Sequence, residues 1–283
     1  MKVIRIDWWL GRVAAMSWAI TELAKKEDVS VITSRPLVFW WNPYIKWLHN
    51  TSDVDLFKNV IKGNEYFELE PYTDPRFYND WVNRLSIAAS QLWLDDIAEP
   101  CMFLAEHEKY SNTLEWKAVL FQPFWSTMQK NGADKSYRSF KIEDAQYIAN
   151  RLLQEWYIVY EVFKQWEQPQ LKWCVVCSGN NMRWIASLAA RYPVIWCDSC
   201  MHHIAKAFGK QSVVMWAATD VGRYWYKSHI NMWENWMVEH TPMRLGTLGF
   251  NFDIVNQHSN EFSKERLDKF IDTSLNYLQS WYK

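Results

Sequence analysis

The chain lacks three things that would narrow its class in other directions. It has only 8 glycines in 283 residues, where average usage of about 7% would supply roughly 20. It has no 18-residue apolar run, which argues against a membrane span. Its formal net charge of −1 gives no overall attraction to nucleic acid or an anionic membrane. We therefore expect a small-molecule partner and consider nucleic acid an unlikely one.

The first residues, MKVIRIDWWLGRV, are too charged, and their apolar run is too short, for a secretory signal. We expect a cytoplasmic location. The five cysteines then indicate free thiols rather than a disulfide framework. With 49% hydrophobic residues, the chain is long enough to form a buried core in one large domain or two ordinary ones, and we favour two.

Strand-like and helix-like patterns alternate from the N-terminus. Residues 2–7 predict a strand, residues 13–27 have helical periodicity, and residues 29–34 predict the next strand. A strand–helix–strand opening of this kind implies a parallel sheet, and ligands of such sheets lie beyond the carboxyl ends of the strands. Residues 80–98 predict a further helix.

A second α/β series follows a polar, irregular segment near residues 100–115, where we place the linker. Residues 263–282 predict an amphipathic closing helix. The expected strands of this series are 117–124, 157–163, 172–178, 194–198 and 212–219, and the expected helices are 142–156, 181–192 and 199–209. The fold class is therefore α/β, with Rossmann-like domains at 1–112 and 113–283.

The most specific stretch is IWCDSCMHHIAKAFGKQSVVMWAATD, residues 195–220. A strand ends in Asp198-Ser199, a helix carries two adjacent histidines and ends in Gly209, and the next strand ends in Thr-Asp. This order resembles the ADP-heptose:lipopolysaccharide heptosyltransferases of glycosyltransferase family 9. The segments 119–139 and 178–196 are also similar to that family, so the resemblance covers roughly residues 115–225 well and the first 35 weakly.

The resemblance implies a GT-B fold, in which two Rossmann-like domains face a cleft. The implied reaction transfers a sugar from a nucleotide-diphosphate donor to an acceptor hydroxyl, saccharide or lipopolysaccharide-like, with inversion. No metal and no cofactor beyond the nucleotide-sugar co-substrate is expected, and the first domain is expected to bind the acceptor. The expected donor-binding residues are Ser126, Lys135, Arg138, Ser178, Gly179, Asn180, Asp198, Ser199, Cys200 and His203.

The chemistry of residues 198–203 agrees with that expectation. Unpaired N–H groups and the dipole at a helix start can hold a diphosphate between Ser199 and His203. Asp198 can cap the helix or bind a ribose hydroxyl. His203 can donate to a phosphate oxygen, or it can be a structural histidine. Lys135 and Arg138 either meet a pyrophosphate or form a solvated basic loop.

The first loop departs from the family pattern. The family has Gly-Asp-Val, whose Asp is regarded as the catalytic base, whereas this chain has Gly11-Arg12-Val13. Arg12 stays protonated and cannot act as a base, although it can bind phosphate in bidentate fashion. Asp7 is the nearest carboxylate and our candidate replacement, with capping of the following turn as its alternative role.

The 20 tryptophans fall partly where the family usually has glycine or another small residue. A bulky side chain disfavours positive φ and blocks close approach of the backbone to phosphate. Two interpretations stay open: aromatic platforms for sugars or bases, or replacement of glycine by tryptophan with an obstructed site. The turn-like positions are Trp8, Trp9, Trp125, Trp196, Trp216 and Trp225; Trp18 and Trp184 fit a core.

Three rival functions remain. One is a catalytically impaired nucleotide- or sugar-binding protein, which Arg12 favours. Another is a GT-B enzyme that glycosylates a nucleic-acid base. The third is a zinc ribbon, because Cys174, Cys177, Cys197 and Cys200 have a suggestive spacing; however, the first pair lies in a strand-like run without a glycine-containing knuckle.

Overall fold

The computed structural model covers all 283 residues. It describes residues 1–7, 10–80, 82–109, 116–124, 139–163, 171–178, 182–197, 199–217, 221–233 and 262–283, without the side chains of residues 78, 79, 163, 178 and 223.

The chain forms two compact units. The first unit holds residues 1–111 together with 182–191 and 200–210, and the second holds 112–181, 192–199 and 211–283. Two segments that lie between strands of the second unit's sheet in the sequence, 182–191 and 200–210, therefore belong to the first unit.

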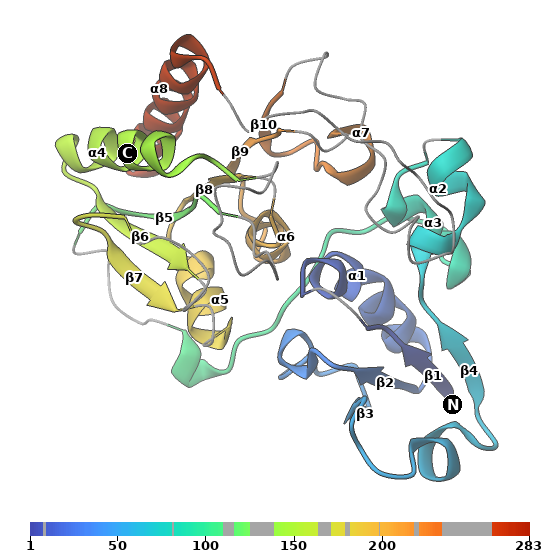
Figure 1. Ribbon diagram of the computed structural model, residues 1–283. Helices are drawn as coiled ribbons and strands as arrows, with labels where there is room; N and C mark the ends of the chain where they lie inside the picture. The colour runs from blue at the N-terminus through green and yellow to red at the C-terminus, as the bar shows by residue number, and fades with distance from the viewer. Residues whose placement is uncertain are drawn as a thin grey trace. The chain divides into compact units, whose positions relative to one another are not determined.

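The first unit contains a parallel sheet of order β3-β2-β1-β4 (Figure 1). Its strands are β1 (Lys2–Arg5), β2 (Val29–Thr33), β3 (Trp47–Asn50) and β4 (Glu65–Glu68). Helix α1 (Leu10–Lys26) makes the crossover from β1 to β2. A π-helical turn, Phe57–Ile61, packs through Val60 on Val3 and Ile32 of the sheet. Short helices α2 (Pro75–Asn79) and α3 (Arg84–Gln91) follow β4.

The second unit contains a parallel sheet of order β10-β9-β8-β5-β6-β7. The strands are β5 (Ala118–Gln122), β6 (Ile158–Phe163), β7 (Val175–Ser178), β8 (Val194–Cys197), β9 (Val213–Met215) and β10 (Ile230–Met232). The helices between them along the chain are α4 (Ile142–Gln154), α5 (Met182–Arg191), α6 (Met201–Ala207) and α7 (Val221–Tyr224), and α8 (Lys264–Trp281) closes the chain.

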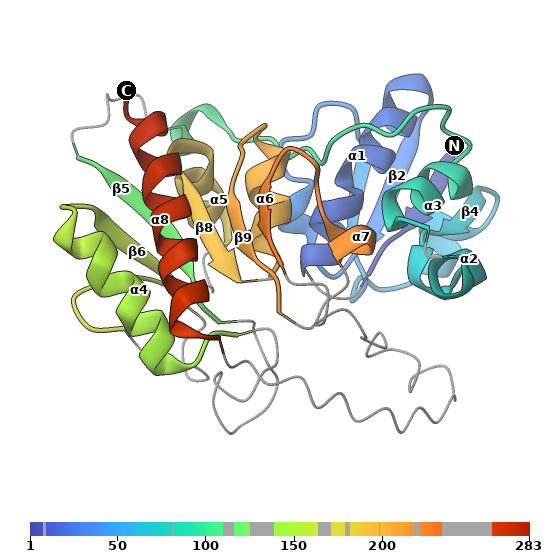
Figure 2. The same ribbon diagram turned by 90° about the horizontal axis from the view of Figure 1, so that it is seen from above.

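Helices α4 and α8 pack side by side on one face of this sheet (Figure 2). Phe121, Phe140 and Phe270 are fully buried between them and the strands. The Tyr147 hydroxyl donates to Asp268 Oδ1 across the helix pair at 2.6 Å. The Tyr282 hydroxyl accepts from Ala118 N at 2.9 Å, so the end of α8 is fastened to the start of β5.

The predicted α/β class with parallel sheets and a C-terminal closing helix is confirmed. The helix expected over 80–98 is wrong in length, because α3 spans only Arg84–Gln91 and residue 93 has a positive φ that ends it. Strands β3 and β4 were not predicted: neither has a buried residue, and both lack the alternation that identifies a half-buried strand. No helix among the described residues has the length and apolar character that crossing a bilayer requires.

Candidate functional site

Half of the twelve candidate site residues lie outside the described residues, and their roles stay predictions. These six are Ser126, Lys135, Arg138, Gly179, Asn180 and Asp198. The others belong to both units. Ser178 and Ser199 are in the second unit, whereas Asp7, Arg12, Cys200 and His203 are in the first.

The second unit's candidates follow the carboxyl ends of its strands. Ser178 is the last residue of β7, and Ser199 comes two residues after β8. The Ser199 hydroxyl donates to Oε1 of Gln122, the last residue of β5, at 2.6 Å. Because parallel strands end at the same edge, these residues belong to the edge where ligands of such sheets bind.

Helix α6 begins at Met201, with Cys200 as its N-cap residue. The helix packs on α1 within the first unit. Gly11 is the point of closest approach, since a Cβ there would lie 3.0 Å from the Cα of Cys200 and 3.2 Å from the ring of His203. Any larger residue at position 11 would push the two helices apart.

A buried polar chain links α1 to α6. Arg12 is 4% exposed and forms an ion pair with Glu70. Its guanidinium lies over the Tyr72 ring, 5.3 Å from the centroid. The Tyr72 hydroxyl accepts from Arg84 Nη1 at 3.2 Å, and Arg84 Nη2 lies 3.2 Å from His203 Nε2. We call these five residues the Arg12–His203 chain.

Within the Arg12–His203 chain, the guanidinium of Arg12 has a defined partner. Its Nη2 also donates to the Leu69 carbonyl at 3.0 Å, so the guanidinium is held by one carboxylate and one carbonyl of a single segment. Arg12 thus holds a carboxylate, Glu70, beside the start of α1. A catalytic role for Arg12 remains a prediction.

His203 is buried against Arg84. It is 4% exposed, and Arg84 Nη2 lies 3.3 Å from its Nδ1 and 3.2 Å from its Nε2. Its ring also contacts that of His202, with centroids 3.7 Å apart. These contacts support a structural role for His203, and donation of a hydrogen bond to a phosphate stays a prediction.

Asp7 follows β1 and bonds within the first unit. Its Oδ1 accepts from Ser34 N at 3.1 Å and from the Ser34 hydroxyl. These bonds join the ends of β1 and β2. Asp7 is therefore bound by the residue that follows β2, and capping of the helix or turn that follows Asp7 itself stays a prediction.

Helix α5 is fastened to the segment before the second sheet through Arg183. Its Nε donates to Glu108 Oε1 at 2.8 Å, and Nη1 and Nη2 donate to the carbonyls of Leu37 and Phe103 at 3.0 and 2.7 Å. The hydrogen bond from Arg183 lowers the pKa of Glu108 below its usual value. All four residues belong to the first unit.

The second unit has a buried carboxylate of another kind. Glu161 of β6 is fully buried; its Oε2 accepts from Leu171 N at 3.0 Å, and Oε1 has no hydrogen-bond partner among the described residues. Burial raises the pKa of Glu161 to about 7. The group has no counter-ion in the described part of the chain.

All five cysteines are free thiols. Burial raises the pKa of Cys174, Cys177 and Cys200 to about 12, so these thiols are protonated at neutral pH. Within the described ranges, no three His, Cys, Asp or Glu side chains are grouped to hold a metal ion.

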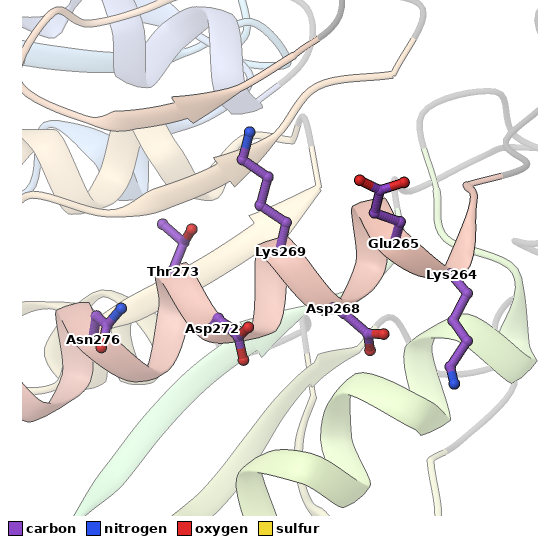
Figure 3. A pocket seen from close by; sticks show the side chains of 7 residues that line it. All are labelled: Lys264, Glu265, Asp268, Lys269, Asp272, Thr273 and Asn276. Atoms are coloured by element: carbon purple, nitrogen blue, oxygen red, sulfur yellow. The ribbon is translucent and has the colours of Figure 1, made fainter.

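One open hollow follows the solvent side of α8 (Figure 3). Asp268 and Asp272 leave the helix on the side facing α4, where Arg151 lies 4.0 and 3.9 Å from them. All of its lining residues come from α8: Lys264, Glu265, Asp268, Lys269, Asp272, Thr273 and Asn276. Acidic and basic side chains are mixed along it, as on an ordinary solvated helix face.

Solved structures share this fold over nearly the whole chain. A glycosyl transferase family 9 protein from Veillonella parvula aligns with 98% of this chain and 97% of its own, with a TM-score of 0.68 and 13% identity. The Escherichia coli ADP-heptose lipopolysaccharide heptosyltransferase II aligns with 96% of this chain and 99% of its own, with a TM-score of 0.59 and 15% identity. E. coli heptosyltransferase WaaC, solved with ADP-2-deoxy-2-fluoro heptose, aligns with 82% of this chain and 93% of its own, with a TM-score of 0.57 and 10% identity.

No protein-family model matches the chain, and neither does any curated protein sequence. At 10–15% identity the likeness establishes the fold. The chain therefore has the α/β fold of GT-B glycosyltransferases, and its solved neighbours are heptosyltransferases or family 9 proteins, as the motif around residues 195–220 led us to expect.

Sequence reasoning missed Glu70, Tyr72 and Arg84. Each is separated from Arg12 by more than fifty residues, and no periodicity links them. The sequence offered one signal, which was Arg12. It lies directly before the apolar helical pattern of residues 13–27, and a cation that is buried at such a place needs a buried polar partner.

Proposed function

We propose that the chain is a glycosyltransferase that moves a sugar from a nucleoside-diphosphate donor to a hydroxyl of a saccharide or lipopolysaccharide-like acceptor. The observation that carries this proposal is the fold likeness, which spans 96–98% of this chain and 97–99% of two solved glycosyltransferases. Likeness over both units is a stronger argument than a shared Rossmann-like half, because a single such half serves many unrelated activities.

In this proposal the second unit binds the donor. Its carboxyl edge carries Ser199 and Gln122, and Ser178 ends the neighbouring part of the same sheet. N–H groups and cations around the diphosphate would stabilise the negative charge that develops on the leaving group. Transfer would proceed with inversion and without a bound metal ion.

Two carboxylates of the first unit are candidates for the general base. Asp7 is bound by Ser34, and Glu70 is bound by Arg12 and by Tyr72 N. A base would take the proton of the acceptor hydroxyl, a step that contributes about 10²–10⁴-fold in rate. Glu70 enters because Arg12 holds it beside the position where the family has Asp.

The test is release of nucleoside diphosphate from a panel of ADP-, GDP- and UDP-sugars with saccharide acceptors. Asp7→Asn and Glu70→Gln are compared after circular dichroism confirms folding. The variant that lacks the true base should have a kcat lower by about 10²-fold or more, with unchanged affinity for the donor. If neither variant changes kcat, these carboxylates are not the base; if no donor is consumed with any acceptor, the enzymatic proposal fails.

A second candidate function is donor binding without turnover. Arg12, a buried cation at the position of the family's base, favours it. It predicts that one nucleotide sugar binds in calorimetry with one site per chain while no nucleoside diphosphate is released under any acceptor condition.

A further inference from the structure

One helix of the first unit ends in a turn that uses glycine in the usual way. After α6, Gly209 N donates to Lys206 O at 2.8 Å, and Lys210 N donates to Ala205 O at 3.0 Å. Gly209 has φ +68°. This pair of bonds is the Schellman ending, whose left-handed residue is usually glycine because a Cβ is strained there.

Helix α4 ends in the same turn with tryptophan in the glycine position. Trp156 N donates to Leu153 O at 3.0 Å, and Tyr157 N donates to Leu152 O at 3.2 Å. Trp156 has φ +63°. The two helix ends therefore have the same hydrogen bonds and the same left-handed backbone, and differ in the side chain that occupies it.

Helix α3 repeats the substitution in the first unit. Trp93 N donates to Ser90 O at 3.4 Å, Leu94 N donates to Ala89 O at 2.9 Å, and Trp93 has φ +53°. A bulky residue at positive φ is an outlier in proteins generally. Two such helix endings in one chain indicate a systematic cause.

The remaining positive-φ positions show the same bias. Trp41 (φ +63°) and Trp173 (φ +68°) lie in turns, and the other non-glycine residue at positive φ in the described chain is Asp55. Aspartate tolerates this conformation, and tryptophan does not. Four of these five non-glycine residues are thus a bulky residue type that is poorly suited to positive φ.

The tryptophan side chains at these turns gain little in return. Trp156 and Trp173 are 88% and 86% exposed, and Trp41 and Trp93 are 58% and 62% exposed. Little burial is available to offset the backbone cost. Trp93 has an edge-to-face contact with Phe67 at 5.0 Å between centroids and Trp41 one with His107 at 6.1 Å, whereas Trp156 and Trp173 have no ring contact within the described residues.

Two buried tryptophans also fit their surroundings poorly. Trp18 and Trp196 are fully buried, and their Nε1 groups have no hydrogen-bond partner among the described residues. A buried indole N–H usually has a partner, as Trp216 has in Asn231 at 2.9 Å. The scarcity of glycine and the excess of tryptophan in this chain, 8 against 20, fit one exchange.

We propose that residues 41, 93, 156 and 173 are glycine in the protein made by its own cell, because that cell reads as glycine a codon written here as tryptophan. UGA provides the route: it is a stop codon under the common code and tryptophan under some others, and a glycine tRNA that reads it would place glycine at each such codon. This inference does not depend on the proposed function.

Thermal unfolding of the protein with tryptophan at these positions tests whether the turns favour glycine. Trp93→Gly with Trp156→Gly should raise the midpoint by roughly 2–4 °C per position, because glycine relieves the left-handed strain. The matched control is Trp116→Gly with Trp233→Gly. These tryptophans are 68% and 45% exposed without positive φ, so glycine should leave the midpoint unchanged or lower it. A fall in the first pair would overturn the glycine assignment.

Peptide mass spectrometry of the protein purified from the cells that encode it tests the decoding directly, and does so even if the chain as written folds poorly. Peptides that span positions 93, 156 and 173 are expected to carry glycine. Tryptophan at these positions would overturn the proposal whatever the unfolding midpoints show. Loss of enzyme activity in any assay would leave this result untouched, so the two proposals fail separately.

Discussion

The two units contain buried charges in different surroundings. In the first unit, Arg12, Arg183 and Lys206 are each at most 8% exposed, and each is ion-paired, to Glu70, Glu108 and Glu99. In the second unit, the core between α4, α8 and the sheet is apolar, and the fully buried carboxylate Glu161 has one hydrogen bond and no counter-ion among the residues that the structure describes.

This contrast teaches where each unit is vulnerable. A paired buried charge becomes costly when its partner is removed, so the first unit should be sensitive to loss of one member of a pair. An unpaired buried carboxyl is costly only while it is ionised, so the second unit should be sensitive to pH. Each prediction below tests one side of the contrast.

The largest effect is expected from Arg12→Met. It leaves Glu70, whose side chain is 13% exposed, without its cation, which should lower the free energy of unfolding by roughly 3–5 kcal/mol. Denaturant titration measures it. The control is Lys25→Met, which removes an exposed i,i+3 pair with Glu22 and should cost at most about 0.5 kcal/mol. Equal losses in the two variants would contradict the distinction between buried and exposed pairs.

Glu161→Gln should produce the next largest effect, and it should stabilise. The folded-state pKa of Glu161 is raised to about 7, so the folded state binds more protons than the unfolded state between about pH 4.5 and pH 7. Stability therefore falls as pH rises through that window. Glutamine removes the ionisation while keeping an acceptor for Leu171 N.

At pH 8 we expect Glu161→Gln to raise the free energy of unfolding by up to about 3 kcal/mol, the equivalent of the raised pKa. At pH 4.5 the variant and the parent should differ little. Urea titrations at both pH values measure the difference. A gain of the same size at both would show that ionisation of Glu161 is not the cause.

Glu108→Gln should give a smaller loss with the opposite pH dependence. The pKa of Glu108 is lowered by its hydrogen bond from Arg183, so the stability it contributes is present above the unfolded pKa, about 4.3, and is lost as pH falls through the folded pKa. We expect a loss of about 1–2 kcal/mol at pH 7, shrinking toward pH 3. A loss that stays constant down to pH 3 would refute the assignment to the charged pair.

The sequence predicted the elements whose patterns are strong. The helical periodicity of residues 181–192 and 263–282 corresponds to α5 and α8, and the apolar run at 194–198 corresponds to β8. The fold class followed from this alternation, because parallel sheets need helical crossovers.

The arrangement of the first unit's site could not be predicted this way. Arg12, Tyr72 and His203 come together only because α1 and α6 approach closely at Gly11, and no local pattern encodes that approach. The early end of α3 was missed for a different reason: residue 93 is written as tryptophan, so the stop signal that glycine gives at a helix end was absent from the sequence.

The most direct test of the glycosyltransferase account is calorimetric titration of the purified chain with ADP, GDP and UDP, in parallel with a Trp8→Gly, Trp9→Gly variant that shortens the side chains before α1. The account predicts saturable binding of one of the three nucleotides, with one site per chain and weaker binding after Ser199→Ala. Absence of binding by all three to both folded proteins would contradict it.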